Sequence, residues 1–154
     1  MRKTIFKLGM AALLGGALLN VPAVTAKPTK KAPAKKTKTA TPKWLTSYKD
    51  AIAQSKKTGK PILMDFNATW CGPCHMLEDE VFKKPSFTAE AKNWVLLSVD
   101  IDKHPDLAEH YSAESIPLLV AVSPKGKTAS RQPGYGGYDY TMKWIKDAYK
   151  KAKK

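Results

Sequence analysis

The chain contains four short apolar runs, and between them segments in which apolar residues recur every three or four positions. The runs are nearly continuous or alternating and predict strands, the first of them buried on both faces of a sheet. They cover 62–66, 95–100, 118–122 and 128–132. The segments with three- and four-residue spacing predict helices. They cover 43–58, about 72–82, about 88–93, a stretch that is entered at 102–105 and ends near 111, and a last stretch that starts after 139 and reaches 152.

The order of these elements predicts an α/β fold with a mixed sheet between helices. A helix joins the first two strands, so we expect them to be parallel. The last two strands are separated only by Ser123-Pro124-Lys125-Gly126. So short a connection does not allow a crossover, and these strands should pair antiparallel.

The charge of the chain is concentrated near its N-terminus. The 154 residues include 27 Lys or Arg and 13 Asp or Glu, a net charge of +14. Residues 1–43 hold ten of the basic residues and no acidic one, so 44–154 carry a net charge of only +4. The basicity therefore does not indicate a nucleic-acid-binding domain, and we expect no nucleic-acid partner.

Residues 1–26 have the pattern of a secretory signal peptide. Three basic residues precede an apolar run over 8–19, whose 12 residues would form a helix of roughly 18 Å, too short for a hydrocarbon core of roughly 30 Å. Small residues occupy Val24-Thr25-Ala26, where a signal peptidase would cut. We expect cleavage near Ala26 and a periplasmic or secreted protein. An uncleaved anchor is the alternative.

Residues 27–43 predict an extended, disordered linker, and 44–154 a single folded domain. The linker contains Lys, Ala, Thr and Pro, with no aromatic or large aliphatic residue to bury. Its seven lysines suit a solvated tether, although weak attraction to anionic surfaces of the cell envelope is an alternative.

Cys71 and Cys74 form the motif Trp70-Cys71-Gly72-Pro73-Cys74 between a predicted strand and a predicted helix. A disulfide closing so small a loop would stabilise a fold by only about 2 kcal/mol, so a structural staple is a poor explanation. At the start of a helix, free N–H groups and the helix dipole stabilise a thiolate. The pair therefore predicts redox chemistry, with Cys74 one turn inside the helix and more buried than Cys71.

The sequence argues against two other uses of the cysteines. Cys71 to His75 also matches the Cys-x-x-Cys-His signature for covalent haem, but the preceding strand and Pro73 argue against it. A zinc site would have to combine both cysteines with His75, His104 and His110, at no recognisable spacing. We therefore expect no metal and no organic cofactor. His75 is a candidate modulator of the neighbouring thiol.

With these features the sequence resembles the thioredoxin superfamily over roughly 44–150. The resemblance rests on the Trp-Cys-Gly-Pro-Cys motif, Asp65 six residues before Cys71, Ile116-Pro117 before a strand, and Gly134 after the hairpin. The stretch from Met76 to Phe82 is most similar to envelope thioredoxin-like proteins and to the C-terminal domain of transmembrane disulfide reductases. The resemblance implies a thioredoxin fold with a central mixed sheet of four to five strands, of which the sequence shows four.

The resemblance also implies roles for individual residues. Cys71 would attack a substrate disulfide, Cys74 would resolve the mixed disulfide, and Asp65, buried with a raised pKa, would accept a proton from Cys74. Pro117 would be cis. The residues implied in peptide binding are Trp70, Gly72, Pro73, Ile116 and Pro117. The family often carries an aromatic residue at the position of Asn67 and a Lys at that of Ser98, so this chain departs from the pattern around Asp65.

Together these features predict an exported monomer that reduces disulfide-containing envelope proteins with electrons from a membrane thiol donor. A disulfide oxidase or isomerase of the same fold is one alternative. A binding or chaperone module whose cysteines have no catalytic role is another.

Overall fold

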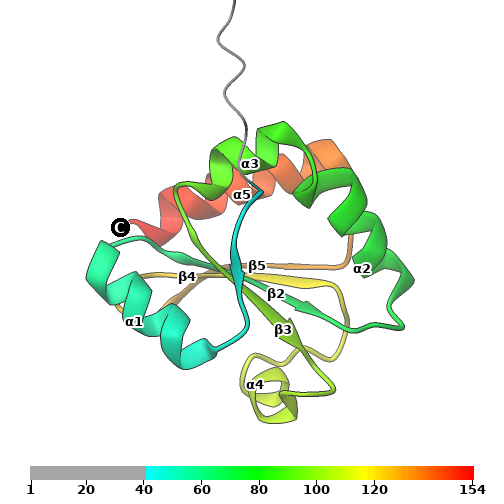
Figure 1. The fold of residues 1–154 in the computed structure, drawn as a ribbon, viewed down its shortest axis with the longest axis horizontal. Coiled ribbons are helices and arrows are strands. Elements are labelled where there is room, and N and C mark those ends of the chain that lie inside the picture. The colour runs from blue at the N-terminus through cyan, green and yellow to red at the C-terminus, as the bar shows by residue number, and fades with distance from the viewer. Residues whose placement is uncertain (1–40) are drawn as a thin grey trace, which may run out of the picture. The chain divides into compact units, whose positions relative to one another are not determined.

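The computed structural model describes residues 41–154, so the signal peptide and most of the linker predicted above lie outside the described residues. The domain is a central sheet with helices on both faces (Figure 1). The strands are β1 (Trp44–Leu45), β2 (Ile62–Asn67), β3 (Val95–Asp100), β4 (Leu118–Val122) and β5 (Thr128–Pro133). The helices are α1 (Tyr48–Thr58), α2 (Gly72–Leu77), the π-helical segment η1 (Glu78–Phe82), α3 (Pro85–Ala91), α4 (Pro105–His110) and α5 (Tyr138–Ala152).

The sheet is mixed and has the order β1-β3-β2-β4-β5. The first three strands in this order are parallel, whereas β4 pairs antiparallel with both β2 and β5. The predicted parallel and antiparallel pairings are confirmed. The order places β2, which leads to the cysteine motif, at the centre of the sheet.

The side chains of β2 alternate between two apolar cores. Ile62, Met64 and Phe66 belong to the core on the side of α1 and α4. Leu63 belongs to the core on the other side, with residues of α2, η1, α3 and α5. Because alternate residues of a strand point to one face, Asp65 lies on the face of Leu63, under α2. The pleat therefore points the only acidic residue of β2 toward the cysteine helix.

The prediction of a single helix over 43–58 is wrong at its start. Trp44 and Leu45 pair with Leu96 and Leu97 of β3 and form the fifth strand. The spacing of Trp44 and Tyr48 resembles a helical repeat, but Trp44 packs on Phe82 whereas Tyr48 packs on Tyr111 of the opposite core. The helix begins only after Ser47, whose side chain accepts the N–H of Asp50 at 3.2 Å.

Other helix boundaries also differ from the predictions. Pro85 starts α3, because proline fits the first turn of a helix. This helix therefore begins and ends earlier than the predicted helix over 88–93. The predicted helix over 72–82 is divided into α2 and η1. Gly134 lies just beyond β5 with φ +72°, a conformation that glycine adopts without strain. Among residues 41–154 no helix is long and apolar enough to cross a membrane.

Candidate active site

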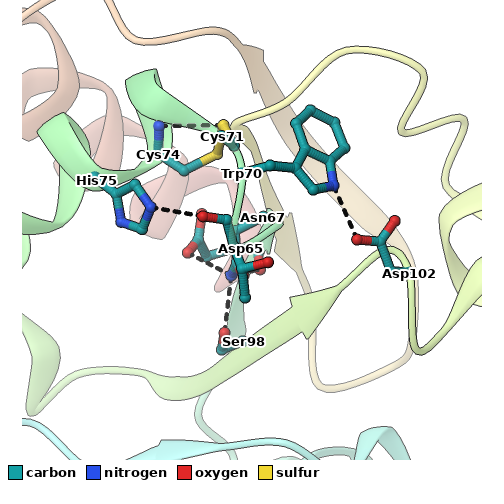
Figure 2. Close-up of a disulfide and its surroundings, with 9 residues drawn as sticks. Asp65, Asn67, Trp70, Cys71, Cys74, His75, Ser98 and Asp102 are labelled. Carbon is teal, nitrogen blue, oxygen red and sulfur yellow. Dashed lines mark hydrogen bonds between the residues drawn. A yellow bond between two sulfur atoms is a disulfide. The ribbon is translucent and has the colours of Figure 1, made fainter.

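The cysteine pair lies where β2 passes into α2. Cys71 is the N-cap residue of α2, with extended backbone, and Pro73 occupies the first turn. The two sulfurs form a disulfide with an S–S distance of 2.06 Å (Figure 2). The Cys71 sulfur also accepts the backbone N–H of Cys74 at 3.2 Å. The first turn of the helix thus directs a donor at Cys71, which suits stabilisation of a thiolate there.

Both cysteines are buried in this disulfide form. Cys71 is 3% exposed and Cys74 is 7% exposed. The expectation that Cys74 would be the more buried of the two is therefore wrong for the disulfide form. Both cysteines belong to one small apolar cluster with Ala68, and the half-buried Ile101 and Ile116 pack against that cluster. The position at the start of α2, rather than exposure, distinguishes Cys71 from Cys74.

Asp65 lies beneath the disulfide and is itself 8% exposed. Burial raises the pKa of Asp65 to about 7, the Asn67 hydrogen bond opposes the shift, and the charge of Glu78 adds to it. The predicted upward shift is confirmed. A carboxyl group with this pKa exchanges protons near neutral pH, as a general base requires.

Asn67 joins Asp65 to Ser98. Its Nδ2 donates to Asp65 Oδ2 at 3.0 Å, to the Asp65 carbonyl at 3.1 Å and to Ser98 Oγ at 2.8 Å (Figure 2). Asp65 and Ser98 are paired in the parallel register of β2 and β3, and Asn67 points to the same face two residues later. The two residues that depart from the family pattern thus contact each other and form one polar cluster with Asp65.

A cavity of about 420 Å³ borders both Asp65 and Cys74. Its walls come from β1 and the loop that follows β1, from the polar cluster on β2 and β3, and from the loop after β2 with α2 and η1. The residues are Trp44, Thr46, Asp65, Asn67, Ala68, Thr69, Cys74, His75, Glu78, Phe82 and Ser98. Asp65 Oδ1 has no hydrogen-bond partner among the described residues, which leaves it free to accept a proton.

The predicted peptide-binding residues surround the disulfide. Trp70 is 66% exposed, and Gly72 and Pro73 are exposed in the first turn of α2. The Ile116–Pro117 peptide bond is cis, as predicted, and the carbonyl of Pro117 accepts the N–H of Gly134 at 2.7 Å. Ile116 packs on the same small apolar cluster as both cysteines.

Two contacts and one exposed side chain at the site had not been predicted. The indole Nε1 of Trp70 donates to Asp102 Oδ2 at 2.9 Å (Figure 2). His75 Nε2 lies 2.9 Å from the Thr69 carbonyl oxygen, so this ring is tied to the loop that precedes Cys71. Met76 is exposed on α2 beside the motif. The position of Asp102 just after the strand β3 was the available signal, because the carboxyl ends of parallel strands meet at one edge of a sheet.

Among residues 41–154, no group of three or more His, Cys, Asp or Glu side chains is placed to hold a metal ion. The three histidines do not come together with the cysteines as a zinc site would require.

Comparisons with known proteins agree with this geometry. Residues 43–124 match the family model described as thioredoxin-like. A thioredoxin of Chlamydia trachomatis serovar D is 40% identical over 99 residues, which are 64% of this chain and 88% of that protein. Residues 43–124, which match the family model, include the cysteine motif and the cis proline.

Two solved structures share the fold. The DsbH oxidoreductase superposes with a TM-score of 0.64 at 23% identity, over 89% of this chain and 95% of that one. The C-terminal domain of Neisseria meningitidis DsbD, in its oxidised form, has a TM-score of 0.60 at 19% identity, over 69% of this chain and 99% of that domain. The fold, the cysteine pair at disulfide distance and the family match lead to one conclusion: the chain belongs to the thioredoxin-like family and is a thioredoxin-like oxidoreductase.

Proposed function

We propose that this protein is an exported thiol–disulfide oxidoreductase that reduces disulfides in proteins of the cell envelope. The observation that carries the proposal is the arrangement of three groups. The Cys71 sulfur sits at the start of α2 and accepts an N–H there, Cys74 lies one turn away, and Asp65 is buried beside Cys74 with a pKa near neutrality.

The first step is attack by the Cys71 thiolate on one sulfur of the substrate disulfide. The substrate S–S bond breaks, a mixed disulfide forms between Cys71 and the substrate, and the other substrate sulfur leaves as a thiolate. The Cys74 N–H at the Cys71 sulfur favours the thiolate that this step needs.

In the second step Asp65 takes the proton of Cys74, and the Cys74 thiolate attacks the Cys71 sulfur. The Cys71–Cys74 disulfide closes and the second substrate sulfur is released. The substrate gains two electrons and the protein loses two. A dithiol donor must return them, and outside the cytoplasm we assign this role to a membrane thiol carrier.

The substrate would bind across the exposed surface around the disulfide. Trp70, Gly72 and Pro73 are exposed on one side, and the half-buried Ile116 lies on the other, followed by the buried Pro117. No charged side chain belongs to this set, which suits extended segments of many proteins rather than one charged partner.

Export is supported by the sequence alone, through the basic start, the short apolar run and the small residues before Lys27. In an oxidising compartment such a pair would start in the disulfide form and would need continuous reduction to act as a reductase.

The experiment is a trap for substrates in the envelope of the native host. Cys74→Ser leaves Cys71 able to attack but removes the resolving thiol, so mixed disulfides should accumulate on Cys71. Cys71→Ser is the matched control, since it keeps one cysteine in the motif. Captured envelope proteins that are released by reductant and absent from the control support the proposal. Equal capture by both variants, or capture by neither, would contradict it.

A further inference from the structure

The turn between β4 and β5 and the end of α5 enclose a second cavity, far from the disulfide. The cavity has a volume of about 420 Å³. Lysines line it: Lys125 and Lys127 from the turn, Lys151 from the last turn of α5, and Lys153 and Lys154 from just after this helix. We call these five residues the lysine hollow.

Each of the five lysine side chains in the hollow is positively charged, and no acidic side chain belongs to its lining. All five lysines are exposed. The salt bridges formed within residues 41–154 use other lysines, and residues 1–43 contain no Asp or Glu that could neutralise the hollow. Five like charges gathered around one depression create a local positive potential that attracts anions.

Stabilisation of the helix end explains only part of this cluster. Lysines in the last turn of α5 interact favourably with the negative end of the helix dipole. Lys125 and Lys127 belong to a hairpin turn, which has no such dipole, yet they border the same cavity. Their placement opposite the helix end is what makes a continuous basic surface.

The lysine hollow lies at the end of the sheet away from the disulfide. Ile62, the first residue of β2, is paired with Val122, the last residue of β4, and the cysteine motif follows the other end of β2. Figure 1 shows the C-terminal end of α5 and α2 on opposite sides of the domain. A large surface bound at the hollow would therefore leave the redox site free.

We propose that the lysine hollow docks the domain on a membrane surface rich in anionic phospholipid. Lysine is a compact point charge on a flexible stem, which suits many mobile phosphates rather than one fixed phosphate. The lining has no Arg for bidentate contact and no aromatic residue on which bases could stack, so nucleic acid is disfavoured. Docking would hold the redox domain at the membrane, and it does not depend on the direction of the redox reaction.

The test measures co-sedimentation with vesicles of phosphatidylcholine that contain about a third phosphatidylglycerol, with pure phosphatidylcholine vesicles as reference. The protein is purified from cells that express the full chain, so that any processing is natural. Lys125→Glu/Lys127→Glu should lower the partition coefficient by about tenfold or more. The matched control is Lys49→Glu/Lys84→Glu, which makes the same change in net charge at two exposed lysines outside the hollow. It should change binding by less than about threefold.

Each outcome bears on the proposal. A selective loss in the hollow variant, with insulin reduction unchanged, supports docking. An equal loss in both variants would assign the binding to net charge or to residues 27–40, and would overturn the proposal. Competition by a few millimolar inorganic phosphate at constant ionic strength would indicate a discrete phosphate site and would overturn the membrane assignment.

Discussion

The Asn67 carboxamide donates to the carboxylate of Asp65 at 3.0 Å and to the hydroxyl of Ser98 at 2.8 Å, from one nitrogen. This contact is the largest influence that lowers the pKa of Asp65, against the burial that raises it to about 7. Burial thus determines the direction of the shift, and Asn67 limits how far the pKa of Asp65 rises.

Asn67→Leu should raise the pKa of Asp65 further, because the carboxylate loses a donor while it remains buried. The pH at which the mixed disulfide resolves should rise with it, by about one unit. Carbon-13 NMR titration of the Asp65 carboxyl measures the first shift and rapid-quench mass spectrometry the second. Ser98→Ala is the control, since it keeps the Asn67–Asp65 contact and should shift the pKa less. An unchanged Asp65 titration in Asn67→Leu would contradict this role.

Asp65→Asn should stabilise the protein at high pH but not at low pH. The pKa of Asp65 is about 7 in the folded protein, and its ordinary value is 3.8. Between pH 3.8 and about 7 the folded protein therefore keeps a proton on Asp65 that the unfolded protein has released. The cost of the buried charge therefore grows as pH rises from about 4 to 7 and is complete above 7, where removal of the charge should add about 2–4 kcal/mol to the free energy of unfolding.

Urea unfolding of the oxidised protein at pH 4 and pH 8 checks this prediction. The difference between wild type and Asp65→Asn should be small at pH 4 and large at pH 8. A difference that is the same at both pH values would mean that packing, not ionisation, determines it.

Asp102→Ala should weaken the binding of protein substrates, and it should leave the rate of reaction with a small disulfide unchanged. The Trp70–Asp102 hydrogen bond fixes an exposed indole beside Cys71. A hydrogen bond to a charged acceptor stabilises a structure by about 1.5–3 kcal/mol when it is shielded from water, and by less when it is exposed. We expect KM for reduction of a protein disulfide to rise about two- to fivefold.

The control is Trp70→Phe, which removes the indole N–H. If the hydrogen bond is responsible, Asp102→Ala should have no further effect in the Trp70→Phe background. Additive losses in the double variant would show that Asp102 acts independently of Trp70.

The exported form should begin at Lys27. A short apolar run followed by Val24-Thr25-Ala26 has the pattern that signal peptidases cut. Intact-mass measurement of the protein from the envelope fraction tests this. A dominant species that retains Arg2 would refute both cleavage and the proposed processing.

Much of the fold could be predicted from local pattern. The β3 and β4 boundaries are those predicted, because each is a buried apolar run between polar or turn residues. β1 could not be predicted, since two residues carry no periodicity and become a strand only by pairing with β3. Trp44 followed by Tyr48 imitates a helical repeat, although the two rings pack on different cores.

The residues of the site could also be predicted, but not all of the contacts among them. The cysteines, Asp65 and the cis Pro117 follow from the motif and its resemblance to a family. The bond from Asn67 to Ser98 spans 31 positions in the sequence, and only the register that sets Asp65 beside Ser98 brings them together. The near-equal burial of the two cysteines was also unpredictable, because it depends on Ile101 and Ile116, which lie in loops later in the chain.

The most direct test of the reductase assignment is the reduction potential of the Cys71–Cys74 couple. Equilibration of the full chain with glutathione redox buffers, followed by alkylation and mass measurement of the dithiol form, gives the value. Gly72-Pro73 between the cysteines resembles reducing thioredoxins, so we predict a potential nearer to about −270 mV than to the value of about −120 mV of a strong envelope oxidant. A potential above about −170 mV would contradict the reductase assignment and would identify the protein as an oxidase or isomerase.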